Sequence, residues 1–298
     1  MRLVRDSGGV RASSLIRYSV ALGLRALRHR EARRAAAWRI WMPLDVDRVA
    51  ELPWAAQQTL NAHPRRVLDL ASPKLLALWL AESSGAEVIA TDAWAEEVET
   101  WRRLASAADP RGRRFDALRL EVADGTALPY QPGEFDAAFS VSVIEHIPGD
   151  GDTAAMAELE RVLRPGGTLA LTFPFRERFE EEFVQHDLYG QHYEGEPIFF
   201  QRHYSLEAVQ QRLLAGRKFE VLTQGLWRKA GVEQAQKRLH RLTPARWELG
   251  RFLGPILPVI GARALSAPVD VSEPGANNVM YLLLRRTRDE SGPAAPSA

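Results

Sequence analysis

The sequence predicts an α/β fold, in which helices cover both faces of a mostly parallel sheet. Short apolar runs typical of buried strands alternate with longer segments whose apolar residues recur at helical spacing. Three of these runs end in, or are followed by, an acidic residue: Asp69, Asp92 and Asp124. The carboxyl ends of parallel strands meet at one edge of a sheet, where ligands bind. The sequence therefore predicts a ligand site lined by carboxylates.

The stretch from Arg65 to Ala81 is read as a buried strand, an abrupt turn and a helix. Ser72 is predicted to be the N-cap of that helix, and Pro73 its first residue, where a missing N–H costs nothing. The free N–H groups of a helix N-terminus favour an anionic group. Lys74 either adds a charge partner for such a group or points to solvent.

The remaining elements follow in alternation. Further strands are predicted at 87–92, 115–122, 135–143, 168–173, 219–226 and 279–284, and helices at 94–107, 153–163 and 206–214. The predicted organisation is a basic helical segment at 1–59, one domain at 60–286 with insertions at 175–204 and 228–276, and a disordered tail at 287–298.

Composition excludes several classes of function. The chain has 298 residues, 46% of them hydrophobic and 26% charged, with a net charge of +1. This balance is ordinary for a globular protein, and no nucleic-acid partner is expected. The absence of cysteine excludes disulfides and thiolate chemistry and fits a cytoplasmic location. Neither a signal peptide nor a membrane-spanning helix is expected.

Two segments outside the alternation have open roles. The first 40 residues interleave arginine with apolar residues, which favours a solvated helix at the edge of the domain over peripheral contact with a membrane. The long insertion at 228–276 is expected to cover the ligand edge of the sheet as a lid. Its apolar residues are also compatible with a membrane or a second subunit.

Two segments carry a resemblance to a known family. Phe135 to Ser140 reads FDAAFS and is followed by VIEHI at 143–147, and residues 160–167 read ERVLRPGG. In combination these resemble class I S-adenosylmethionine-dependent methyltransferases of the small-molecule, methyltransferase-11-like type. The resemblance covers about 60–227 and 277–286. It implies a Rossmann-like sheet of seven strands, the last of them antiparallel, with S-adenosylmethionine as cofactor.

The resemblance also implies roles for individual residues. Asp92 would accept hydrogen bonds from the ribose hydroxyls, and Asp124 one from the adenine amino group, with Gly125 allowing close approach. Asp69 would hold the amino end of the methionine, beside backbone at Ser140. The cofactor-binding candidates are Asp69, Ala71, Ser72, Lys74, Asp92, Asp124, Gly125 and Ser140.

One departure from the family leaves a second function open. The family has glycines after the first strand, whereas this chain has none between Asp69 and Gly85. The main hypothesis is methyl transfer to a small molecule by a turn that binds the cofactor with different chemistry. The alternative is a non-catalytic scaffold or binding protein of the same fold. A nicotinamide dehydrogenase ranks last, because G-x-G-x-x-G is missing.

His146 is the candidate general base, since histidine titrates near neutral pH and this one follows the fourth strand. A purely structural role for this histidine is equally compatible with its position. The aromatic residues of 175–204 favour an apolar or aromatic acceptor. His186, His192 and His203 lie in that segment with Asp187 and Glu194, but their spacing matches no known metal site, so no metal is expected.

Overall fold

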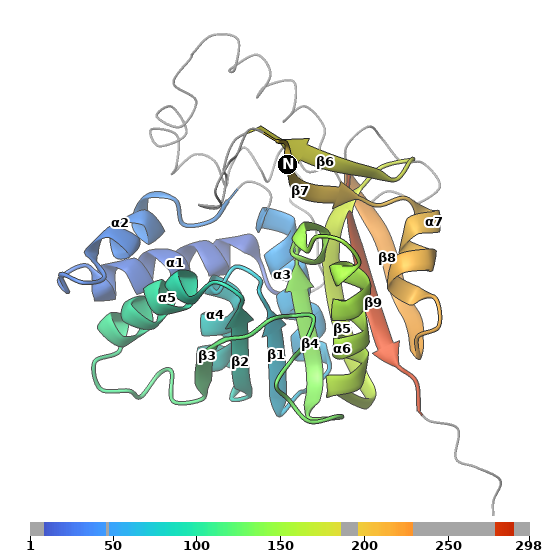
Figure 1. Cartoon of the computed structure of the whole chain (residues 1–298). Coiled ribbons are helices and arrows are strands. Elements are labelled where there is room, and N and C mark those ends of the chain that lie inside the picture. Colours follow the sequence, from blue (N-terminus) through green and yellow to red (C-terminus); the bar gives the residue numbers. More distant parts are fainter. Residues whose placement is uncertain (1–8, 46–47, 186–195, 229–277, 289–298) are drawn as a thin grey trace, which may run out of the picture.

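The computed structural model describes residues 9–45, 48–185, 196–228 and 278–288 (Figure 1). Its main sheet has seven strands in the order β3-β2-β1-β4-β5-β9-β8. The strands are β1 (Arg66–Leu70), β2 (Glu87–Asp92), β3 (Leu118–Val122), β4 (Phe135–Val141), β5 (Leu163–Phe175), β8 (Phe219–Arg228) and β9 (Asn278–Arg286). Strand β9 is antiparallel to both of its neighbours, and the other pairings are parallel. The predicted Rossmann-like fold with an antiparallel last strand is confirmed.

Helices cover both faces of this sheet. Val67, Val88 and Val141 point to one face, where they pack against α1 (Ala12–Ala26), α2 (Arg33–Trp41), α3 (Arg48–Asn61), α4 (Leu75–Ser84) and α5 (Ala95–Ala108). Leu68 and Leu169 point to the other face, against α6 (Gly151–Val162) and the α7 segment (Leu206–Ala208). The alternation of side chains along each strand thus separates the core into two layers.

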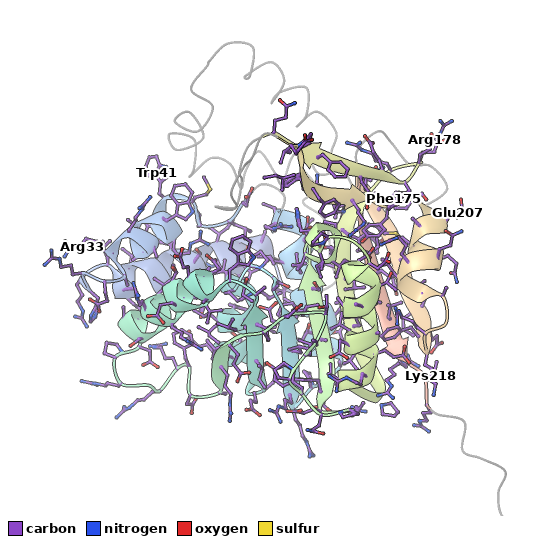
Figure 2. All side chains as sticks on the ribbon, viewed as in Figure 1. Arg33, Trp41, Phe175, Arg178, Glu207 and Lys218 are labelled. Atoms are coloured by element: carbon purple, nitrogen blue, oxygen red, sulfur yellow. The ribbon has the colours of Figure 1, made fainter. Side chains whose placement is uncertain are left out.

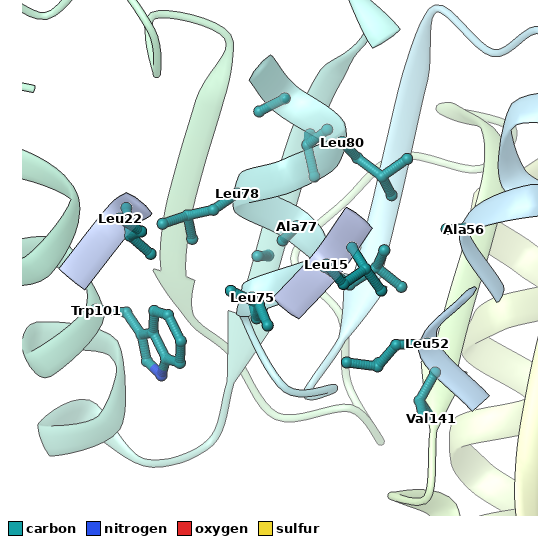
Figure 3. Packing of buried hydrophobic residues seen from close by; sticks show 14 of the residues in the cluster. Leu15, Leu22, Leu52, Ala56, Leu75, Ala77, Leu78, Leu80, Trp101 and Val141 are labelled. Carbon is teal, nitrogen blue, oxygen red and sulfur yellow. The ribbon is translucent and has the colours of Figure 1, made fainter. Parts of the chain in front are cut away.

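The N-terminal helices belong to the same hydrophobic core as the sheet. Leu15 and Leu22 of α1 are fully buried and contact the cluster around Leu75 and Leu78 of α4 (Figure 3). Trp101 of α5 packs at the edge of this cluster. The apolar face of α1 is therefore occupied by protein.

Strand β5 begins earlier than predicted. It starts at Leu163, directly after α6, and includes the Arg164-Pro165-Gly166-Gly167 segment that was expected to separate helix from strand. A Cβ on Gly167 would lie 2.9 Å from the carbonyl oxygens of both Arg164 and Asp136. Glycine is required here because two backbones approach each other so closely.

The helix predicted at 206–214 is divided. Only Leu206–Ala208 is α-helical, and Val209–Leu214 forms a π-helical turn that ends with Ala215 N donating to Gln210 O at 2.7 Å. Before this segment, β6 (Glu180–Val184) and β7 (Ile198–His203) form a separate two-stranded sheet. This small sheet lies across the end of the main sheet at which β5 finishes (Figure 1).

Two predictions fall mostly outside the described residues: the lid at 228–276 and the disordered tail at 287–298. Within the described part of the chain, no helix combines the length and the apolar character needed to cross a membrane.

Candidate active site

The turn after β1 keeps a conformation that usually requires glycine. Ala71 has φ of +54°, in the left-handed region that side chains other than glycine rarely adopt. Its N–H donates to Thr91 O at 3.0 Å, and the Thr91 hydroxyl donates to Asp69 O at 3.0 Å. These bonds to β2 hold the turn in place. The backbone at position 71 is therefore still left-handed, although the turn contains no glycine.

The predicted role of Ser72 as N-cap is wrong. Helix α4 begins at Leu75 with Lys74 as its N-cap, so Pro73 also lies before the first helical residue. The Ser72 hydroxyl instead accepts a hydrogen bond from Val141 N at 2.9 Å, at the end of β4. This amide is the last of its strand and needs a partner, which the serine supplies from the neighbouring turn.

Lys74 lies inside the site, so the alternative that it points to solvent is also wrong. Its side chain is 1% exposed, and Nζ donates to Ser72 O at 2.6 Å. Nζ lies 3.7 Å from Oδ2 of Asp69 and 3.4 Å from Oδ2 of Asp92. The lysine ammonium thus sits between two of the acids that the sequence singled out.

Asp69 and Asp92 are positioned by adjacent parallel strands. Asp69 is fully buried, and its Oδ1 accepts from Ser72 N at 2.9 Å. Burial raises the pKa of Asp69 to about 6, although Lys74 and the Ser72 N–H act in the opposite direction. Asp92 is 9% exposed, and its Oδ1 accepts from Trp94 N at 3.1 Å.

Asp124 and Gly125 lie at the same edge of the sheet. Ala123 N donates to Asp92 O at 2.9 Å, which joins the segment after β3 to the end of β2. Asp124 is exposed, and its Oδ1 accepts from both the N–H and the hydroxyl of Thr126 at 2.8 Å. A Cβ on Gly125 would lie 3.0 Å from Leu70 Cδ1, so this glycine packs against β1.

Ser140 is also at this edge, but its side chain is engaged within the sheet. It is buried, and its hydroxyl donates to Leu70 O at 3.1 Å. This bond ties the ends of β4 and β1 together. Only the backbone of Ser140 is therefore in a position to line a pocket.

The structure adds a buried acid that the sequence analysis missed. Glu51 of α3 is 1% exposed, and its Oε2 accepts hydrogen bonds from the hydroxyls of Ser142 and Thr172, at 2.8 and 3.0 Å. Arg48 pairs with the same oxygen. Among the described residues, Oε1 has no hydrogen-bond partner. The sequence feature that could have identified Glu51 is its place on the apolar face of a helix, between Val49 and Leu52.

His146 lies at the same end of the sheet, in a short 3-10 turn (Ile144–His146). Its Nδ1 is 2.7 Å from Phe200 O, and a carbonyl only accepts, so Nδ1 carries the proton and Nε2 the lone pair of the neutral ring. Burial lowers the pKa of His146, with a smaller contribution from the charge of Arg48. The imidazole is therefore neutral near pH 7, as a general base must be.

Strand β7 is anchored beside His146 by a buried arginine. Arg202 is fully buried and donates to the carbonyls of Ile147 and Gly149. His203 pairs with Glu182 at 3.0 Å, while His186, Asp187, His192 and Glu194 lie outside the described residues. In the part of the chain that the structure describes, no three His, Asp or Glu residues come together in a way that suits a metal ion.

Comparisons with known proteins agree with this geometry. A family model described as a methyltransferase domain matches residues 68–171, which run from β1 into β5. The methyltransferase GfsG of Streptomyces halstedii is 36% identical over 96 residues, which are 32% of each chain. An uncharacterized 37.1 kDa protein in transposon TN4556 of Streptomyces fradiae is 35% identical over 119 residues, 39% of this chain and 32% of its own. The chain thus matches about a third of the length of these curated relatives.

Solved structures share the fold at low identity. The [4+2]-cyclase SpnF has a TM-score of 0.51 and 18% identity, over 96% of this chain and 99% of its own. A candidate sarcosine dimethylglycine methyltransferase from Galdieria sulphuraria has a TM-score of 0.50 and 15% identity, over 79% and 85%. Residues 68–171 of this chain thus match a methyltransferase domain, and the sheet that contains them has the strand order β3-β2-β1-β4-β5-β9-β8.

Proposed function

We propose that the protein transfers a methyl group from S-adenosylmethionine to a small-molecule acceptor. The observation that carries this proposal is the pair of carboxylates at the ends of β1 and β2, inside the matched methyltransferase domain. The backbone of the turn between them is left-handed at Ala71, as a cofactor-binding glycine would be. The methyltransferase name of the relative GfsG supports the same reaction.

The residues present fit the cofactor. Asp92 is the one of the two acids that retains exposed surface, and a carboxylate accepts two hydroxyl hydrogen bonds at once, as a ribose requires. The exposed Asp124 is placed to accept from an adenine amino group. The turn from Ala71 to Lys74 and the buried Asp69 would hold the methionine portion. When bound, S-adenosylmethionine supplies an electrophilic methyl group on a sulfonium.

The remaining chemistry belongs to residues of this chain. Methyl transfer is an in-line displacement, so alignment of the acceptor and exclusion of water contribute most. We assign His146 Nε2 as the base that removes a proton from an acceptor hydroxyl or amine, because its Nδ1–H is fixed by Phe200 O and its ring is neutral. The exposed rings of Phe179 and Phe183 around β6 favour an apolar or aromatic acceptor.

The β6–β7 ribbon is placed to exclude water. Phe175, at the end of β5, is buried beneath it and forms an isolated bridge with Tyr204 (Figure 2). The ribbon is also tied to the 144–149 segment by Arg202. A cytoplasmic location is part of the proposal, from the cysteine-free composition.

A non-catalytic binding protein is the second candidate, and Lys74 is the observation that favours it. A lysine ammonium 3.7 and 3.4 Å from the two acids offsets part of their negative charge without any ligand. The [4+2]-cyclase SpnF also shows that proteins with this fold have names other than methyltransferase. The acids and the domain match rank methyl transfer first.

Calorimetric titration of the purified full chain with S-adenosylmethionine, S-adenosylhomocysteine and NAD tests the proposal. We expect both adenosyl ligands to bind and NAD not to. Asp92→Ala should weaken binding about 10- to 150-fold, the equivalent of one hydrogen bond to a charged group. Asp116→Ala, at an exposed position after α5, is the matched control and should bind like the wild type. A folded wild type that binds neither adenosyl ligand at millimolar concentration would leave the binding-protein candidate in its place.

A further inference from the structure

Lys74 is unusual because its whole side chain is buried. Lysine is almost never fully buried unless its charge is paired, and here it is 1% exposed. Its nearest polar partners are Ser72 O, Asp69 and Asp92. All three belong to the turn and strand ends where the proposed function places the cofactor.

The two acids share the same arrangement of partners. In each, Oδ1 accepts from a nearby backbone N–H: that of Ser72 for Asp69 and that of Trp94 for Asp92. In each, Oδ2 faces Lys74 Nζ, at 3.7 and 3.4 Å. The oxygens that remain available for a ligand are therefore the ones with which the lysine ammonium already pairs.

We propose that Lys74 is an internal competitor for the cofactor and so sets the affinity and charge preference of this site. The inference rests on the proposed function. The lysine ammonium offers Asp69 and Ser72 O the same interactions that the amino group of a bound methionine moiety would offer. It also occupies the Asp92 oxygen that would accept from a ribose. Binding then requires Lys74 to release Asp92, which its flexible stem permits while Nζ keeps Ser72 O.

The charge of Lys74 also distinguishes the two adenosyl ligands. S-adenosylmethionine has two positive groups, the sulfonium and the ammonium, and one negative carboxylate, so its net charge is +1. S-adenosylhomocysteine has no sulfonium and is neutral overall. At a pH where both carboxylates are ionised, the two acids and Lys74 sum to −1, and the two acids alone sum to −2, so the titrations are made well above the pKa of Asp69. A positive charge between the acids therefore disfavours S-adenosylmethionine more than S-adenosylhomocysteine.

The test is calorimetric titration of the full chain carrying Lys74→Met, which keeps the length of the side chain and removes its charge. We expect S-adenosylmethionine to bind about tenfold more tightly than to the wild type, the scale of one charged hydrogen bond. The gain for S-adenosylhomocysteine should be smaller. Lys218→Met is the control: this lysine is exposed and lies at the opposite end of the sheet from Phe175 (Figure 2), so neither affinity should change.

A second pair of variants protects the test against misfolding, because Lys74→Met leaves two carboxylates close together. Asp69→Asn removes one of these charges and keeps the oxygen that accepts from Ser72 N. Binding to Asp69→Asn is compared with binding to the double variant Asp69→Asn/Lys74→Met, and thermal melting confirms that both are folded. We expect the double variant to bind S-adenosylmethionine more tightly than Asp69→Asn.

The outcomes separate this inference from the proposed function. Binding by the wild type with equal or weaker binding by both lysine-free variants would overturn the inference and leave the function in place. A silent wild type and a binding Lys74→Met variant would support the competitor role and, at the same time, remove methyl transfer by the wild type. No binding of either adenosyl ligand by any folded variant would remove the proposed function, and the competitor with it.

Discussion

The Ser142 hydroxyl donates a hydrogen bond of 2.8 Å to Oε2 of Glu51, across 91 residues of sequence. This bond joins helix α3 of the N-terminal segment to the residue that follows β4. Thr172 of β5 and Arg48 share the same carboxylate oxygen. The N-terminal helices therefore take part in forming the end of the sheet where the candidate active site lies.

Glu51→Ala should destabilise the protein by roughly 2–3 kcal/mol, since buried hydroxyls lose a charged acceptor and Arg48 loses its partner. Urea unfolding followed by circular dichroism measures this change. Glu99→Ala is the control, because its pair with Arg103 is exposed and contributes less than about 1 kcal/mol. Equal losses for the two variants would mean that the buried cluster does not stabilise the fold.

Ala71→Gly should raise the free energy of unfolding by up to about 1 kcal/mol. The left-handed backbone costs an alanine ~1–2 kcal/mol, which glycine avoids. The greater freedom of glycine in the unfolded chain lowers the free energy of unfolding by ~0.4–1 kcal/mol and so offsets part of this gain. Ala157→Gly, at an exposed position within α6, should instead lose about 1 kcal/mol. Chemical unfolding of both variants decides the point, and a loss at position 71 similar to that at 157 would contradict the prediction.

Asp69 should make the protein less stable as the pH rises. Its folded pKa of about 6 lies above the ordinary value of 3.8, because burial disfavours the charged carboxylate. The contribution of Asp69 to the free energy of unfolding is complete below pH 4 and is lost as the pH rises through 6. The loss is about 3 kcal/mol at most. The measurement is the stability of the wild type minus that of Asp69→Asn, from pH 4 to 7. This difference should fall across the range; a constant or rising difference would exclude the raised pKa.

The charge of Lys74 lowers the pKa of Asp69 in the intact protein. Lys74→Met should therefore move the titration of Asp69 to higher pH. Comparing the pH dependence of stability in Lys74→Met with that of Lys74→Met/Asp69→Asn isolates this carboxylate. An unchanged midpoint would show that the lysine and Asp69 are not coupled.

His146→Ala should lower turnover by ~10²- to 10⁴-fold with little change in cofactor affinity, if the acceptor loses a proton to it. Because burial lowers the pKa of His146, the midpoint of the acid limb in a plot of kcat/KM against pH should lie below pH 6.5. His63→Asn serves as the control, since His63 is exposed and asparagine tolerates its positive φ. A parallel loss of folding stability and activity in His146→Ala would point to a structural role.

The sequence by itself determined the strands of the main sheet, their succession along the chain and the acids at their ends, but not β6 and β7 of the small sheet. These features are local, because strand patterning and the turn that follows a strand depend on neighbouring residues. Asp69, Asp92 and Asp124 could be assigned to one edge because parallel strands all end on the same side. The family resemblance extended this to a seven-stranded sheet with an antiparallel last strand.

Only the tertiary structure decided what the side chains in the turn do. Ser72 reads as a helix cap because serine often caps helices, but the unpaired amide of Val141 lies within reach of its hydroxyl. Lys74 reads either as a charge partner for an anionic group of a ligand or as a solvent-exposed residue, yet two carboxylates of the protein, from different strands, lie beside its ammonium. Glu51 is brought to Ser142 and Thr172 by helix packing. In each case at least one partner comes from another element of the fold (Val141, Asp92, Ser142), and local sequence carries no information about which groups long-range packing will bring together.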